Sequence, residues 1–160
     1  MGRPRAQGAT EYLVILGAVL LVALVVIALL GWFPSLGGAT REQQSRSYWA
    51  GAAPFGILAQ RFDNGSAMLT IENHGSDRLN LSLIQFDDGA GTIYNLTFTP
   101  TVFVSGESKV IYNSSFTGGN PCVVLKPGSQ FEYAQVIFTY MQGAYQMRQY
   151  GAKPLAARCA

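Results

Sequence analysis

The chain has 160 residues, of which eleven are basic and nine are acidic. Two of the basic residues, Arg3 and Arg5, precede every acidic one, so the rest of the chain carries nine charges of each sign. This balance lacks the basic footprint of nucleic-acid-binding proteins, and we expect no nucleic-acid partner. About 100 residues remain after the apolar N-terminal segment, which is enough for one folded domain.

A long apolar run follows the basic N-terminus. No charged residue occurs between Tyr12 and Phe33, a length that spans roughly 30 Å of hydrocarbon as a helix. Since basic residues favour the cytoplasmic side, the N-terminus is predicted to lie inside and the bulk of the chain outside. Gly31 and Pro34 predict an interruption near Trp32. The run is longer than a secretory signal core, although cleavage near Ala39 stays an alternative.

A second helix is predicted to begin at Thr40, because Thr40 and Gln43 form a capping box, and to end before Pro54. From Phe55 onward, apolar residues recur at every second position, as in strands with one buried face. The alternating sets are Leu69 and Ile71; Leu79, Leu81 and Leu83; Tyr94, Leu96 and Phe98; and Val136, Phe138 and Tyr140.

Turn sequences rich in glycine, asparagine, aspartate and proline separate these segments and predict seven or so short strands. They are Asn64-Gly65, Asn73-His74-Gly75, Asp87-Asp88-Gly89, Ser105-Gly106, Gly118-Gly119-Asn120-Pro121 and Pro127-Gly128. The expected fold class is α+β, with a long N-terminal hydrophobic α-helix followed by an antiparallel immunoglobulin-like β-sandwich.

The two cysteines, Cys122 and Cys159, have neither the spacing of a zinc site nor that of a haem attachment. Both fall on the side of the membrane that is predicted to be outside, so we expect a disulfide between them. In the chain-entropy model, a loop of this length restricts the unfolded state by about 4 kcal/mol.

Four of the six asparagines begin an Asn-x-Ser/Thr triplet, which is more than chance predicts. The excess predicts an N-glycosylated surface protein, and the alternative is that these residue types are simply common on wet strands and turns. The candidate sites are Asn64, Asn80, Asn95 and Asn113.

Signals for catalysis are weak. The single histidine, His74, lies in a predicted turn, and no Cys-x-x-Cys pair or phosphate-binding loop occurs. The acidic triplets at Asp63 and Asp87 lack the spaced oxygen ligands of a calcium loop. We therefore expect no enzyme, no cofactor and no metal site, while a secreted or anchored enzyme relying on His74 stays a rival interpretation.

Glu11 is a carboxylate at the edge of the apolar run, where full insertion into a membrane costs up to about 3 kcal/mol. No basic residue lies within one helical turn of it. Cleavage between Ala6 and Gln7 supplies a partner, because it creates an α-amine at Gln7 that a neighbouring chain can place beside Glu11.

The nine residues from Arg5 to Leu13 resemble the class III signal peptide of archaeal type IV pilin-like proteins. The resemblance implies that a prepilin peptidase removes the leader, residues 1–6, and that Glu11 becomes the fifth residue of the mature chain. It also implies that residues 7–54, the hydrophobic helix and its connector, reside in the membrane before assembly and then form the filament core. Residues 55–160 are then the outward-facing, glycosylated β-domain.

The expected function is that of a structural subunit of an extracellular type IV pilus-like filament used in adhesion. Its partners are copies of itself, the peptidase and the assembly machinery, and the precursor lies in the cytoplasmic membrane before it reaches the cell surface. Small residues in the helix allow close packing: Gly17, Ala18, Ala23 and Ala28. The alternatives are an archaellum-type motility filament and a monomeric, membrane-anchored binding module.

Overall fold

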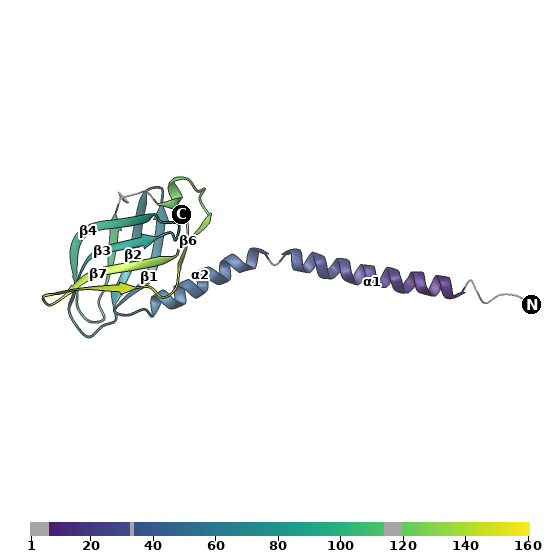
Figure 1. Cartoon of the computed structure of the whole chain (residues 1–160), viewed down its shortest axis with the longest axis horizontal. Helices are drawn as coiled ribbons and strands as arrows, with labels where there is room; N and C mark the ends of the chain where they lie inside the picture. The colour runs from purple at the N-terminus through teal and green to yellow at the C-terminus, as the bar shows by residue number, and fades with distance from the viewer. Residues whose placement is uncertain (1–6, 33, 114–119) are drawn as a thin grey trace, which may run out of the picture. The chain divides into compact units, whose positions relative to one another are not determined.

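The structure, a computed structural model, describes residues 7–32, 34–113 and 120–160, and for residues 7–10 and 29–39 it describes the backbone alone. The chain divides into two compact units, Met1–Ala39 and Thr40–Ala160, and each is treated by itself. Figure 1 labels the helices and strands of both units.

Two helices precede the strands. Helix α1 extends from Gln7 to Trp32 and α2 from Pro34 to Ala50, while Phe33, at the predicted interruption, lies outside the described residues, so the interruption stays a prediction. The predicted start of the second helix at Thr40 is wrong, because Thr40 lies inside α2. The helix ends before Pro54, as predicted.

Nine strands occur within the described residues, all in antiparallel ladders. A three-stranded sheet has the order β1-β2-β5, a four-stranded sheet has the order β4-β3-β7-β8, and β6 pairs with β9. The first two sheets pack face to face in an immunoglobulin-like order, which confirms the predicted α+β fold class. The strand bounds are β1 Phe55–Asp63, β2 Ser66–Asn73, β3 Leu79–Asp87, β4 Ile93–Phe103, β5 Ser108–Asn113, β6 Gln130–Tyr133, β7 Gln135–Gln142, β8 Tyr145–Tyr150 and β9 Leu155–Arg158.

The core lies between the two larger sheets and is rich in aromatic rings. Phe55 of β1 packs against Phe103 of β4 and against Phe138 of β7, with ring centroids 5.5 Å and 5.7 Å apart. The inward alternation of Val136, Phe138 and Tyr140 is as predicted. These contacts join residues from distant parts of the chain, so the sandwich is held mainly by burial of its inner faces.

One predicted alternation fails in β3. Leu79 and Leu81 are buried, but Leu83 is only partly buried, and Ile84 and Phe86 continue the inner face instead. The register with both neighbouring strands shifts between Leu81 and Leu83. Because a bulge adds one residue, it moves every later side chain to the opposite face of the sheet.

The C-terminal part of α2 is fixed to the β-domain through the segment before β9. Trp49 is almost fully buried, and its Nε1 atom donates a hydrogen bond to the Pro154 carbonyl at 3.3 Å. Ser45 donates to the same carbonyl at 3.1 Å and accepts from the Ala156 N–H at 2.9 Å. This part of the helix therefore belongs to the folded domain.

Candidate functional site

The surface of α1 is almost entirely apolar. Thirteen large apolar side chains between Tyr12 and Ile27 are exposed, and the segment Glu11–Ala28 has a mean hydropathy of 2.7 with none of it buried. Among the described residues, α1 is the one helix that is both long enough and apolar enough to cross a membrane. Apolar surface of this extent marks a site that lipid or protein covers. Together with the disulfide described below, it indicates a secreted or membrane-associated protein.

Gln7 and Glu11 lie one turn apart on α1, which begins at Gln7. Residues four apart share one face of a helix. Glu11 is exposed, and it makes no ion pair with any residue that the structure describes. Ala6, the residue before the predicted cut, lies outside the described residues, and cleavage stays a prediction.

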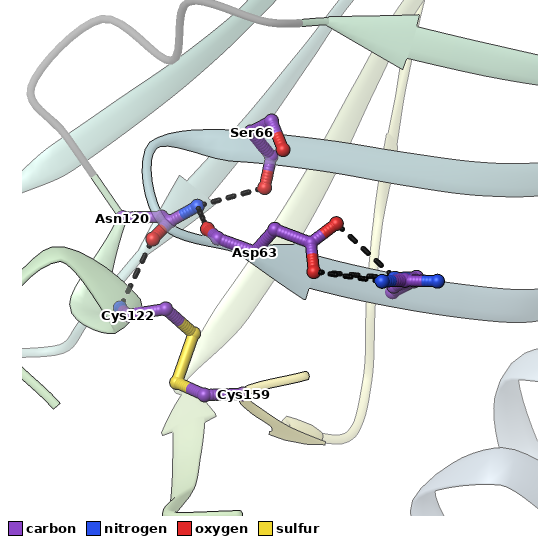
Figure 2. The surroundings of a disulfide bond; sticks show 6 residues. Asp63, Ser66, Asn120, Cys122 and Cys159 are labelled. Carbon is purple, nitrogen blue, oxygen red and sulfur yellow. Dashed lines mark hydrogen bonds and ion pairs between the residues drawn. A yellow bond between two sulfur atoms is a disulfide. The ribbon is translucent and has the colours of Figure 1, made fainter. Parts of the chain in front are cut away.

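The predicted disulfide between Cys122 and Cys159 is present, with Cα atoms 5.5 Å apart. Figure 2 shows that it links the loop after β5 to the C-terminal end of the chain. Cys159 also forms a bridge with Phe62 of β1, and the Ala160 N–H donates to the Phe62 carbonyl at 2.9 Å. These backbone contacts with Phe62 tie the C-terminus to the three-stranded sheet.

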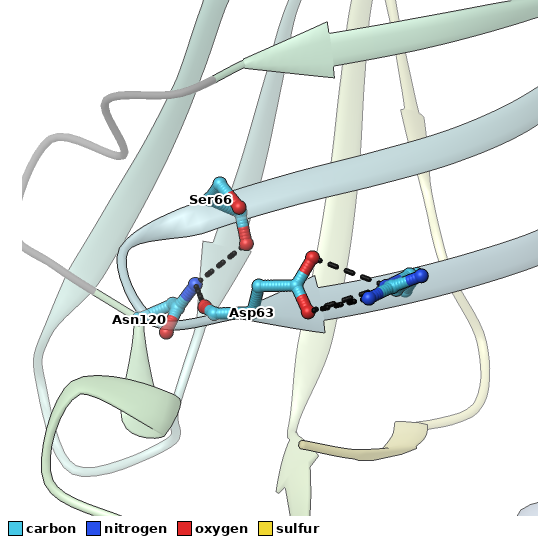
Figure 3. A network of polar contacts seen from close by, with 4 residues as sticks. Asp63, Ser66 and Asn120 are labelled. Carbon is cyan, nitrogen blue, oxygen red and sulfur yellow. Dashed lines mark hydrogen bonds and ion pairs between the residues drawn. The ribbon is translucent and has the colours of Figure 1, made fainter. Parts of the chain in front are cut away.

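Asn120 connects the loop of this disulfide to the β1–β2 turn (Figure 2), and Figure 3 shows its bonds to Asp63 and Ser66 from close by. Its Nδ2 atom donates to the carbonyls of Asp63 and Ser66 at 2.8 Å and 2.9 Å. Its Oδ1 atom accepts from the Cys122 N–H at 3.0 Å and caps a short 3-10 helix, Pro121–Val123. Sequence reasoning assigned Asn120 only to a turn. Its buried amide is instead fully used in joining two segments far apart in the chain.

The four glycosylation triplets lie in different environments. Asn64 is exposed in the tight β1–β2 turn, beside Gly65 with φ of +79°. Asn80 and Asn95 lie on the outer face of the four-stranded sheet, and the Asn95 Oδ1 atom accepts from Gln85 at 2.9 Å. Asn113 Nδ2, the atom that N-glycosylation would modify, donates to the Thr97 carbonyl. Asn64 is therefore the most accessible acceptor of the four.

His74 lies in the turn after β2, where its backbone N–H donates to the Pro54 carbonyl at 2.8 Å. Its Nε2 atom is 3.7 Å from the Glu72 carboxylate. Within the described ranges, no group of three histidine, cysteine or acidic side chains could hold a metal ion. The geometry around His74 is that of a turn with one weak polar neighbour.

Two carboxylates in other turns have perturbed acidity. Backbone N–H groups of Thr92 and Ala90 hold the pKa of Asp88 below its usual value. The Val104 N–H, followed by Lys109, lowers the pKa of Glu107. Each carboxylate closes a loop between consecutive strands through these bonds, so the shifted pKa values reflect turn structure.

A cavity that sequence reasoning did not predict lies between α2, β1 and β9. It has a volume of about 100 Å³, and the side chains of Trp49, Ile57 and Leu155 form its apolar walls. Gln60 also lines it and donates from Nε2 to the Ala156 carbonyl at 2.7 Å. Its Oε1 atom is buried and accepts no hydrogen bond from any described residue. The cavity forms only where three distant segments meet, so no local pattern signals it.

No protein-family model and no curated protein matches this chain.

Proposed function

We propose that this protein is the structural, non-enzymatic subunit of an extracellular filament of the type IV pilus kind, acting in surface adhesion. The observation that carries the proposal is the uncovered apolar surface of α1 on a chain whose other unit is a disulfide-linked β-sandwich. Burying thirteen large apolar side chains is worth on the order of 20 kcal/mol. Lipid covers this surface before assembly, and neighbouring copies of α1 cover it in the filament.

Small residues on α1 support close packing between copies. A Cβ atom added at Gly17 meets no atom within 4 Å, so the backbone there is open to a neighbouring helix. Ala18, Ala23 and Ala28 extend this pattern along the helix, and small residues let helix backbones approach closely. In this proposal the contact between copies is heterologous, because each copy uses different faces toward its two neighbours. The assembly therefore grows as a filament and does not close into a ring.

Glu11 sets the register of the assembly in this proposal. Prepilin peptidase cuts between Ala6 and Gln7, and the new α-amine of Gln7 pairs with Glu11 of an adjacent copy. A charge pair in an apolar surrounding is costly to break, since removal of one partner leaves the other unpaired. The pairing therefore selects one axial offset between neighbouring helices.

The first test is a substitution of the carboxylate. Glu11→Gln keeps the size of the side chain and removes its charge, so we expect normal leader removal and a loss of most surface filaments. Glu132→Gln, an exposed carboxylate on β6, is the matched control and should assemble normally. The readouts are N-terminal sequencing of the mature chain and filament counts by negative-stain electron microscopy.

Three results distinguish the proposal from its rivals. A mature chain that begins at Met1 or after Ala39 contradicts the predicted cleavage. Single particles in place of filaments support a membrane-anchored binding module that uses α1 as its anchor. Filaments of normal number and stability from Glu11→Gln show that the electrostatic account of assembly is wrong.

A further inference from the structure

The turn between β1 and β2 contains the one asparagine of the chain that glycine follows. Asn64 and Gly65 link the paired residues Asp63 and Ser66, and the Asn64 side chain is exposed. Neither the Asn64 side-chain amide nor the Gly65 N–H makes a hydrogen bond with any residue that the structure describes. A Cβ atom added at Gly65 meets no heavy atom within 4 Å, so the turn has open space around it.

An asparagine that precedes glycine in such a turn can cyclise without an enzyme. The Gly65 nitrogen, after loss of its proton, attacks the Asn64 Cγ atom. A C–N bond forms, ammonia leaves, and the product is a cyclic succinimide. Water then adds to either ring carbonyl and opens the ring to aspartate or isoaspartate. Glycine favours the attack because no side chain crowds its nitrogen and its backbone rotates freely.

Other asparagines in the described ranges lack these conditions. Asn80 and Asn95 lie within β3 and β4, and each precedes a leucine. Asn73 is fully buried. Asn120 precedes a proline, whose nitrogen carries no proton to lose. The reaction is therefore specific to Asn64 among these residues.

We propose that Asn64 is a site of spontaneous deamidation and that a glycan on the same side chain blocks it. Asn64 also begins one of the acceptor triplets for N-glycosylation. The sugar is attached to Nδ2, which is the atom that leaves as ammonia during cyclisation, so one side chain undergoes one reaction or the other. The inference goes beyond the proposed filament and does not rest on it, because the reaction occurs within a single chain.

Isoaspartate in this turn disturbs the loop that carries the disulfide. One nitrogen, Asn120 Nδ2, binds the carbonyls of Asp63 and Ser66 at 2.8 Å and 2.9 Å (Figure 2). Isoaspartate adds one carbon atom to the backbone between these two residues, so the two bonds do not both keep their geometry. Asn120 also caps the short helix that contains Cys122. We therefore expect conversion to expose the disulfide, which is buried in the unaltered chain.

Peptide mass spectrometry of the full-length chain tests the reaction. The chain is made in a bacterial host without glycosylation, purified in detergent and incubated at mildly alkaline pH. Asn64 should gain the mass difference between O and NH, while Asn80 and Asn95 stay intact. No conversion at Asn64, or equal conversion at all three asparagines, overturns the proposal.

Gly65→Asp is the matched control for this reaction. Aspartate tolerates the φ of +79° at this position better than most residues do, and its side chain crowds the attacking nitrogen. The variant should show no product over the time that converts half of the unaltered chain. Conversion of Gly65→Asp at the unaltered rate contradicts the proposed attack by the Gly65 nitrogen.

Ser66→Ala tests the protection by a glycan, because it removes the acceptor triplet and keeps Asn64 before Gly65. In the glycosylating cells that normally make the protein, deamidation should appear in Ser66→Ala and be absent from the unaltered chain. Equal deamidation of the two chains contradicts the protection.

The rate at which a small thiol reduces the disulfide tests the structural consequence. The chain that has converted to isoaspartate should be reduced severalfold faster than the unaltered chain. Freshly prepared Asn64→Asp is the matched control, since it carries the charge of the product without the additional backbone carbon, and it should be reduced at the unaltered rate. Equal rates for the converted chain and Asn64→Asp overturn the link between this turn and the disulfide.

Discussion

Gln149 joins the two sheets of the sandwich through its side-chain amide. Its Oε1 atom accepts from the Phe55 N–H at 2.8 Å, and its Nε2 atom donates to the Phe55 carbonyl at 2.9 Å. Gln149 lies on β8 of the four-stranded sheet, whereas Phe55 begins β1 of the three-stranded sheet. Both residues are buried. The amide therefore takes the place of a partner strand on the free edge of β1, whose other edge pairs with β2.

Gln149→Leu should destabilise the domain by about 3 kcal/mol. The substitution keeps a similar volume but leaves a buried N–H and a buried carbonyl without these bonds, and each such group costs about 1–3 kcal/mol. The added apolar burial offsets part of this cost. For a folded unit of this size, the change lowers the melting temperature by roughly 10 °C.

Urea denaturation of the full-length chain in detergent micelles, followed by circular dichroism, measures this effect. Gln146→Leu is the matched control, because Gln146 lies on the same strand but is exposed. Its unfolding free energy should stay within about 0.5 kcal/mol of the unaltered chain.

A second variant tests the geometry of the bonds. Gln149→Glu mimics the amide when it is protonated, since a carboxylic acid both donates and accepts. Burial raises the pKa of such a carboxyl, so this variant should be most stable in acid and lose stability as the pH rises through that raised pKa. The reasoning is refuted if Gln149→Leu unfolds within 1 kcal/mol of the unaltered chain, or if Gln149→Glu is insensitive to pH.

Two further predictions concern a close packing contact and a turn carboxylate. Gly151→Ala should destabilise the β-domain by about 3 kcal/mol or more, because a Cβ atom there overlaps the Trp49 ring. Thermal unfolding measures this loss of stability, and Gly51→Ala, where an added Cβ atom makes only ordinary contacts, is the control. Equal losses of stability in the two variants would contradict the overlap. The lowered pKa of Asp88 stabilises the fold above the unfolded-state value, and this contribution is lost as the pH falls through the folded-state pKa. The stability advantage over Asp88→Asn should therefore shrink between about pH 5 and pH 2 in urea titrations, and parallel pH curves would rule this out.

Local patterns in the sequence predicted much of the architecture. The apolar run predicted α1, Gln7–Trp32. Period-two alternation predicted the inner faces of most strands. These features depend on neighbouring residues only, because helix periodicity, strand alternation and proline geometry act within a few positions.

The predictions that failed depend on contacts or on competing local signals. Thr40 and Gln43 match a capping box, yet Thr40 lies inside α2, Pro34–Ala50. The bulge in β3 moves Leu83 away from the core, because the register with β4 and β7 shifts beside it. No alternation within β3 alone reveals such a shift, since pairing decides it.

By itself, the sequence determined that this chain has an apolar helix, an alternating β-domain and one pair of cysteines. The tertiary structure alone decided that Gln149 bonds Phe55, that Asn120 joins the disulfide loop to the β1–β2 turn, and that a cavity forms beside Trp49. These polar bonds and the cavity connect segments separated by many residues. Their energies exist only after folding has buried the partners together, which is why local sequence patterns do not contain them.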